Sequence, residues 1–160
     1  MFIGNYLDDL SKSLEHLYGS PIVVIVFTAF LLIASYTDVM HLKIPNKLNG
    51  MFFLSRFAMI PILGFSLWDV AAGILCFIAL LIPAMVKMNK MGGDIKCVTV
   101  IGLYTSMGLA PTFLILACFY SALYTGVSYL AGRKVRMFPF APFFLLSNVT
   151  LLIVYYSGYI

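Results

Sequence analysis

Charged residues are scarce in this sequence. Asp, Glu, Lys and Arg make up 10% of its 160 residues, whereas they make up about 25% of a typical soluble chain. Apolar residues make up 62%, against about 45–50% in soluble proteins. A soluble domain of this size leaves much of its surface in water and could not bury so much apolar area. The composition therefore excludes an ordinary soluble domain and predicts a membrane protein.

Cysteine is also rare, and it follows no ligand pattern. Cys76, Cys97 and Cys118 each lie inside an apolar stretch, and none belongs to a CxxC pair. This spacing indicates small buried hydrophobic side chains, so we expect no disulfide framework, no metal site and no cofactor. The net charge of +4 comes from short basic clusters between apolar runs, and we expect no nucleic-acid partner.

The N-terminal residues lack a secretory signal pattern. Asp8, Asp9 and Glu15 precede the first long apolar run, whereas a signal peptide begins with basic residues. We therefore divide the chain into an N-terminal lead-in at residues 1–19 and a transmembrane domain at residues 20–160. The lead-in can form a short amphipathic helix, and we favour a solvated or interfacial position for it.

Apolar runs predict the membrane spans, since a helix needs about 20 mostly apolar residues to cross a bilayer. We expect six spans, at about 20–37, 48–67, 70–86, 94–108, 112–131 and 140–159. The fourth and fifth share one uncharged run, which we divide at Gly108 to Pro111 because proline interrupts a helix. Arg56 lies inside the second span, where its side chain can snorkel to the interface or face a polar interior, and we favour snorkelling. The predicted fold class is an all-α membrane protein, a polytopic bundle of about six transmembrane helices.

Basic residues gather on one side of this topology. The loops at 39–47, 87–96 and 132–139 contain eight of the ten Lys and Arg residues. Cytoplasmic loops of membrane proteins are rich in Lys and Arg. We therefore expect this face to be cytoplasmic and both termini to lie outside.

Two aspartates lie at this basic face. Asp38 closes the first predicted span and Asp94 opens the fourth, so packing of these helices would bring both carboxyl groups to one depth. Ionisable residues at membrane depth indicate a functional site. Two carboxyl groups about 3 Å apart share a proton, so that one acts as a base toward water while the other polarises a carbonyl. The pair predicts aspartyl protease chemistry in which the two groups titrate as a unit.

Other roles for these aspartates stay open. Asp94 at a helix start can act as a cap, whereas Asp38 at a helix C-terminus opposes the helix dipole. A proton- or cation-coupled transporter could use the same carboxyl groups, although transporter sites usually lie near the membrane midplane. A non-catalytic assembly factor is a third alternative. A metal site that adds His41 to the two aspartates is disfavoured, because the spacing is not diagnostic.

The sequence around both aspartates resembles type IV prepilin peptidases. The stretch Asp38-Val-Met-His-Leu-Lys-Ile-Pro-Asn46 resembles the first motif of that family, in which Ile-Pro-Asn begins six residues after an Asp. The stretch Met91-Gly-Gly-Asp-Ile-Lys96 resembles the second motif, the GxGD signature with a following Lys. The stretch Arg136-Met-Phe-Pro-Phe-Ala-Pro-Phe143 resembles the basic loop and Pro-Phe-Ala-Pro that precede the last helix. The three matches come in family order.

The chain departs from the family pattern in two ways. Met91 stands where the GxGD signature has its first Gly. Nothing matches the four-cysteine metal motif in the methyltransferase region of longer members. The chain therefore resembles the short, peptidase-only members that serve Flp or Tad-type pili, and we expect no methyltransferase activity and no use of S-adenosylmethionine.

The resemblance implies an intramembrane aspartyl endopeptidase whose catalytic residues are Asp38 and Asp94. Its substrates would be prepilin-like proteins, whose short basic leaders are cut at the cytoplasmic edge of the bilayer. We place the protein in the inner membrane of a bacterial cell as a multi-pass protein, with lipid and prepilins as its partners.

Six further residues form the predicted substrate-binding or loop-shaping set: Ile44, Pro45, Asn46, Gly92, Gly93 and Lys96. The glycines allow close approach of another chain. Proline restricts the loop after the first span, and Asn46 is expected to cap the second span. The presence of Lys96 is explained by the excess of basic residues in cytoplasmic loops, and its charge can also stabilise nearby carboxylates.

Overall fold

The structure is a computed structural model that describes residues 2–87, 92–132 and 139–158. All the regular elements in these ranges are helices. They are α1 (Phe2–Tyr18), α2 (Pro21–His41), α3 (Asn46–Ala58), α4 (Ile60–Leu63), α5 (Leu67–Lys87), α6 (Gly92–Leu130) and α7 (Ala141–Ser157). The predicted all-α class is confirmed.

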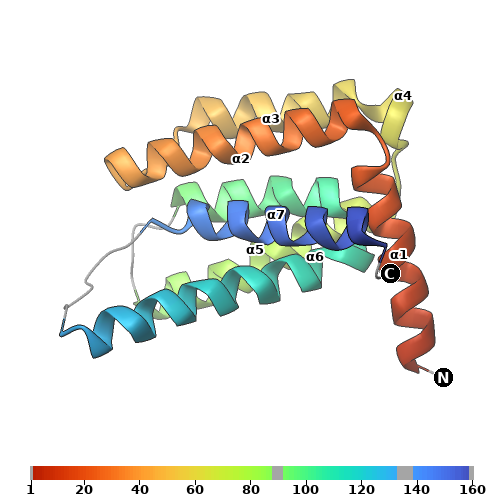
Figure 1. The fold of residues 1–160 in the computed structure, drawn as a ribbon. Helices are drawn as coiled ribbons and strands as arrows, with labels where there is room; N and C mark the ends of the chain where they lie inside the picture. Colours follow the sequence, from red (N-terminus) through yellow and green to blue (C-terminus); the bar gives the residue numbers. More distant parts are fainter. Residues whose placement is uncertain (1, 88–91, 133–138, 159–160) are drawn as a thin grey trace.

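The long helices run side by side, and their termini gather at two opposite ends of a bundle (Figure 1). We call one of these the loop end; it contains the last residues of α2 and α5 and the first residues of α3, α6 and α7. The other is the α1 end, where α1 runs across the bundle and α4 turns the chain from α3 into α5. Residues far apart in the sequence therefore meet at the loop end.

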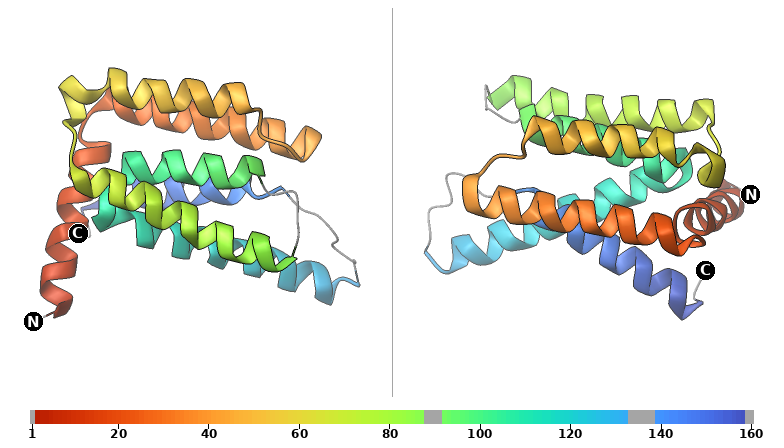
Figure 2. Two further views of the ribbon diagram at one scale, coloured as in Figure 1. Left: turned by 180° about the vertical axis from the view of Figure 1, so that it is seen from behind. Right: turned by 90° about the horizontal axis from the view of Figure 1, so that it is seen from above.

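Helix α6 consists of two limbs that are joined by a reversal at Ser106. Ser106 has a non-helical backbone, with φ 55° and ψ 175°, and the chain doubles back there, so that both limbs lie along the bundle (Figure 2). We predicted the break at Gly108 to Pro111, and the structure places it slightly earlier. Proline is best tolerated near the start of a helix, so the reversal precedes Pro111 and the second limb contains it.

Membrane-spanning potential is clearest in two helices. By length and composition, α2 and α6 can cross a membrane, whereas the apolar stretches Leu67–Ile82 and Ala141–Ser157 are shorter. The predicted second span, 48–67, is interrupted, since α3 ends at Ala58 and α4 is a separate short helix. These helices are consistent with a helical membrane protein, and the expected number of six crossings stays a prediction.

An aromatic cluster joins α2, α3 and the first limb of α6. The ring of Phe52 on α3 stacks between Phe30 of α2 and Tyr104 of α6, with ring centroids 3.5 Å and 4.4 Å away. Phe27 of α2 contacts both Phe52 and Tyr104. Aromatic pairs of this kind contribute about 0.5–1.5 kcal/mol beyond their buried area. The cluster therefore fixes the three helices that carry the predicted site residues against one another.

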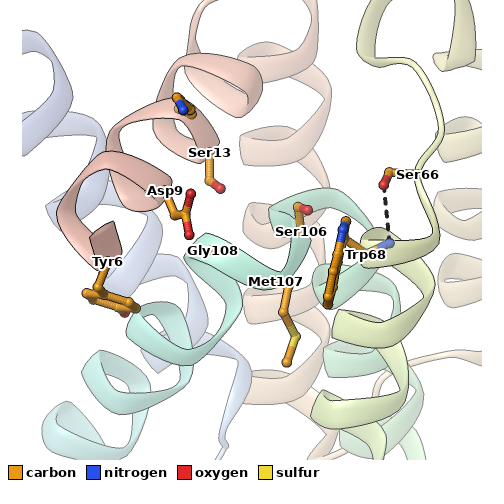
Figure 3. A pocket seen from close by; sticks show the side chains of 9 residues that line it. Tyr6, Asp9, Ser13, Ser66, Trp68, Ser106, Met107 and Gly108 are labelled. Atoms are coloured by element: carbon orange, nitrogen blue, oxygen red, sulfur yellow. Dashed lines mark hydrogen bonds between the residues drawn. The ribbon is translucent and has the colours of Figure 1, made fainter. Parts of the chain in front are cut away.

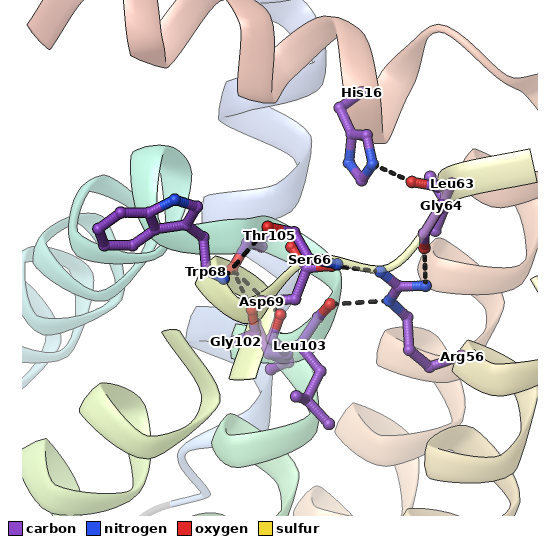
Figure 4. A network of polar contacts seen from close by, with 11 residues as sticks. His16, Arg56, Leu63, Gly64, Ser66, Trp68, Asp69, Gly102, Leu103 and Thr105 are labelled. Carbon is purple, nitrogen blue, oxygen red and sulfur yellow. Dashed lines mark hydrogen bonds and ion pairs between the residues drawn. The ribbon is translucent and has the colours of Figure 1, made fainter. Parts of the chain in front are cut away.

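The prediction that Arg56 snorkels to the interface is wrong. Its side chain is buried, 1% exposed, and forms an ion pair with Asp69 at 2.7 Å (Figure 4). It also donates to the backbone oxygens of Leu103 at 2.8 Å and Gly64 at 3.1 Å. A guanidinium with a carboxylate and two carbonyl acceptors is satisfied inside the protein, so it need not reach water.

Helix α1 packs on the bundle by its apolar face. Leu10, Leu14 and Leu17 are buried, which is the spacing of one face of an amphipathic helix. Tyr6 and Thr112 are joined by a hydrogen bond of 2.6 Å between their hydroxyl oxygens. The lead-in is therefore helical. The favoured solvated or interfacial position is wrong for its apolar side, which the bundle covers. The division of the chain into a lead-in and a transmembrane domain stays a prediction.

Candidate active site

Asp38 lies in the last turn of α2, at the loop end. Its side chain is buried, 3% exposed, and its Oδ2 accepts the backbone N–H of Ala141 at 2.9 Å. Ala141 is the first residue of α7, where backbone N–H groups have no helical acceptor. The bond satisfies one of these donors and fixes the orientation of the Asp38 carboxyl group.

Asp94 lies in the first turn of α6, also at the loop end, and is partly buried. Both aspartates thus lie at the loop end, and Asp94 is within electrostatic range of Asp38. Cys97, which follows about one turn later on α6, is fully buried and lies within electrostatic range of both carboxyl groups. The structure thus places Asp38 and Asp94, from two helices, at the same end of the bundle, while their catalytic role stays a prediction.

The loop between α2 and α3 packs directly on the residue before Asp94. A Cβ atom added to Gly93 would lie 3.1 Å from the backbone oxygen of Ile44 and 3.3 Å from its nitrogen. The Asn49 side chain of α3 donates from Nδ2 to the backbone oxygen of Gly93 at 3.1 Å. Glycine permits this approach because it has no side chain, so Ile44 and Gly93, both of the predicted set, pack against each other.

A second contact joins the same two segments. Lys96 donates from Nζ to Oδ1 of Asn46 at 3.1 Å. The prediction that Asn46 caps α3 is wrong, because the N-cap residue is Pro45 and it makes no side-chain cap bond. Pro45 already has the extended backbone that precedes a helix, with φ −62° and ψ 135°, so Asn46 becomes the first helical residue and its side chain meets Lys96.

Gly92 differs from its neighbour. A Cβ atom built on it would meet no other described residue within 4 Å. Met91, which departs from the GxGD signature, lies outside the described residues, as do Arg136 and the basic loop around it. Of the third motif, the described part begins at Pro139 and leads into α7, which supplies the N–H that binds Asp38.

Two residues at this site were missed by sequence reasoning. Ala141 lies in the third motif but received no role there, because it contributes through its backbone N–H and not through its side chain. Asn49 follows Asn46 by three residues, and residues three apart share one face of a helix. That spacing, applied to the first turn of α3, is the signal that could have indicated Asn49.

A pocket of about 350 Å³ lies at the α1 end (Figure 3). Asp9 and Ser13 of α1, Ser106 and Met107 at the reversal of α6, and Trp68 of α5 line part of it. None of the residues that line it belongs to the predicted site. The pocket and the aspartate pair are therefore separate features at opposite ends of the bundle.

Comparison with known proteins agrees with the motifs. A family model, the type IV leader peptidase family, matches residues 25–126, a range that contains both aspartates. The prepilin leader peptidase/N-methyltransferase of Bacillus subtilis (strain 168) is 34% identical over 125 residues, which cover 74% of this chain and 50% of that protein. The chain thus spans about half the length of this relative, and no solved structure matches it. On this match and this identity, the chain belongs to the type IV leader peptidase family.

Proposed function

We propose that this protein is an intramembrane aspartyl endopeptidase that removes the leader from prepilin-like substrates, with Asp38 and Asp94 as its catalytic pair. The proposal rests on the position of these two residues at the loop end, one on α2 and one on α6, within electrostatic range of each other. Membership of the leader peptidase family supports the class of reaction.

The chemistry follows from two neighbouring carboxyl groups that share one proton. The ionised group takes a proton from a water molecule as the water oxygen attacks the scissile carbonyl, and the protonated group donates its proton to the carbonyl oxygen. Breakdown of the tetrahedral intermediate transfers a proton to the leaving amine. Because the pair acts as a unit, neither Asp38 nor Asp94 is assigned one fixed role.

The contacts around the pair support a loop-shaping role for the neighbouring motif residues. Ile44 lies against Gly93, and Asn46 binds Lys96. The first contact joins the loop after α2, and the second joins the start of α3, to the beginning of α6, which carries Asp94. We propose that these contacts hold the two carboxyl groups in register.

The loop end faces the cytoplasm in this proposal, in the inner membrane of a bacterial cell. Lys43, Lys47 and Lys96 are exposed there, and such residues favour the cytoplasmic side. A short basic leader that stays in the cytoplasm would then reach the aspartates without crossing the bilayer.

The test is co-expression with a prepilin, followed by measurement of the fraction of leader removed. Asp38→Asn and Asp94→Asn are each expected to lower the cleavage rate by at least roughly a thousandfold, as loss of one member of a catalytic unit does. Asp8→Asn is the matched control, because Asp8 is exposed on α1 at the opposite end. Cleavage at the normal rate by either dyad variant would refute the proposal.

We further propose that this chain cuts without methylating its product. Its three cysteines are one fewer than the four-cysteine metal motif needs. Mass analysis of the mature substrate after reaction with S-adenosylmethionine is expected to show an unmodified N-terminus. A methylated N-terminus that appears only with the active protein would contradict this.

A further inference from the structure

Two buried polar atoms near the aspartate pair have no hydrogen-bond partner among the described residues. One is Oδ1 of Asn49, whose residue is 4% exposed, and the other is Oγ of Ser35, whose residue is 7% exposed. A buried polar atom without a partner destabilises a fold, so each such atom requires an explanation. A ligand that supplies the missing partner is one such explanation.

Both atoms are tied to the aspartates by position. Asn49 donates from Nδ2 to the backbone oxygen of Gly93, the residue before Asp94. Ser35 precedes Asp38 by three residues on α2, so the two side chains share one face of that helix. One unpartnered atom thus lies on α2, which carries Asp38, and the other lies on α3, which is bonded to the residue before Asp94.

The orientation of the Asn49 amide is set by its partner. Gly93 offers a carbonyl oxygen, which only accepts, so the nitrogen of the Asn49 amide must face it and Oδ1 must face elsewhere. Oδ1 is therefore an acceptor that requires a donor. The hydroxyl of Ser35 both donates and accepts, so it does not indicate whether a ligand is a donor or an acceptor. Oδ1 of Asn49 does indicate this, because it can only accept.

We propose that Oδ1 of Asn49 accepts a backbone N–H of the bound substrate, close to the scissile bond. A substrate that is cut at a peptide bond must be locally extended there, and its exposed backbone N–H groups then need acceptors where water is scarce. Asn49 supplies such an acceptor beside Asp94. This inference rests on the proposed peptidase function and makes Asn49 a substrate-positioning residue.

The experiment combines a change in the substrate with a change in the protein. Synthetic substrate peptides carry one amide-to-ester replacement each, at positions on either side of the scissile bond but not at it, so that one N–H is removed at a time. Each ester and its parent amide are cut by the wild-type protein and by Asn49→Leu. Asn49→Ala repeats the measurement in case leucine impairs folding.

We expect one ester to lower kcat/KM of the wild-type protein about fivefold to tenfold, the effect of one lost hydrogen bond. The same ester should be cut by Asn49→Leu and Asn49→Ala as fast as its parent amide, because the acceptor is already gone. A structural role alone would slow amide and ester equally, so the ratio of the two rates isolates the contact.

Asn148→Leu is the matched control. Asn148 is buried on α7, but both ends of its amide are bonded, with Oδ1 accepting from Tyr18 at 3.0 Å and Nδ2 donating to Thr28 at 3.0 Å. Its loss is expected to lower stability and to leave the ester penalty intact.

Either of two results would overturn the inference: no flanking ester slows the wild-type protein, or the ester penalty persists in both Asn49 variants. The second result would mean that another group, or water, receives the N–H. Failure of the wild-type protein to cut the parent amide is a different result, which refutes the peptidase function itself.

Discussion

Gly92 and Gly93 are neighbours in the second motif but have different surroundings. Gly93 lies against the backbone of Ile44 and accepts a hydrogen bond from Asn49, whereas a side chain on Gly92 would meet no other described residue. Only Gly93 therefore needs to be glycine for packing. From the sequence the two residues looked alike, because close approach is a property of the neighbouring segment.

This difference gives a residue-scale prediction. Gly93→Ala is expected to lower the leader cleavage rate by about tenfold, because its Cβ atom would displace the backbone of Ile44 by a few tenths of an ångström beside Asp94. The cleavage rate of Gly92→Ala should stay within about threefold of the wild-type rate, since alanine has a higher helix propensity than glycine. Both rates are measured in membranes that contain equal amounts of protein. Equal loss in the two variants would show that backbone freedom, and not space, is the requirement.

At the scale of elements, the buried pair of Arg56 and Asp69 ties three helices together. Arg56 belongs to α3, Asp69 to α5, and the acceptor Leu103 to the first limb of α6. The network lies near His16 of α1 (Figure 4). Leu103 lies close to the reversal at Ser106, so the network holds the first limb of α6 at the terminus opposite Asp94.

Removal of Arg56 alone should therefore lower the free energy of unfolding more than removal of both Arg56 and Asp69. Arg56→Met is expected to destabilise the protein by about 3–5 kcal/mol, because it leaves the Asp69 carboxylate buried without its cation. The double variant Arg56→Met/Asp69→Leu should recover part of this loss. Thermal unfolding in detergent measures both, and a single variant as stable as wild type would refute the role given to the pair.

The contact between α5 and the first limb of α6 depends on a small residue. A Cβ atom on Gly102 would lie 2.7 Å from the backbone oxygen of Ala72 and 2.9 Å from Sγ of Cys76. Gly102→Ala is expected to destabilise the protein by about 1–3 kcal/mol through overpacking. Gly126→Ala, on the second limb, meets no described neighbour and should be neutral or stabilising by up to about 1 kcal/mol. The same thermal assay compares the two variants. A Gly102→Ala protein more stable than the Gly126→Ala protein would contradict the close packing of α5 on α6.

Across the whole molecule, apolar runs predicted where helices lie, and the places of Asp38 and Asp94 at helix ends predicted that both lie at the same end of the bundle. Apolar periodicity and proline positions are local signals, so they sufficed for α2, α5 and α7. The position of Arg56 was wrongly predicted because its partners, Asp69 and Leu103, come from other helices, and no residue near Arg56 in the sequence indicates them. Asn46 was misjudged for the same reason, since its partner Lys96 lies on α6.

The proposed orientation of the whole molecule predicts a labelling pattern. In a background without the three native cysteines, Lys47→Cys at the loop end should react with a membrane-impermeant maleimide only after the cells are permeabilised. Ser66→Cys, at the α1 end, should react in intact cells. Both positions are exposed in the structure, so reactivity reports the side of the membrane, and the opposite pattern would reverse the topology.

The most direct test of the central claim, that Asp38 and Asp94 act as one catalytic unit, is a double-mutant cycle. Residual cleavage of a prepilin is measured in vesicles for Asp38→Asn, Asp94→Asn and the double variant. Members of one unit are non-additive, so we predict that each single variant loses as much activity as the double variant. Losses that multiply in the double variant, or a single variant that keeps more than about a tenth of the wild-type rate, would show that the two aspartates do not act as one unit.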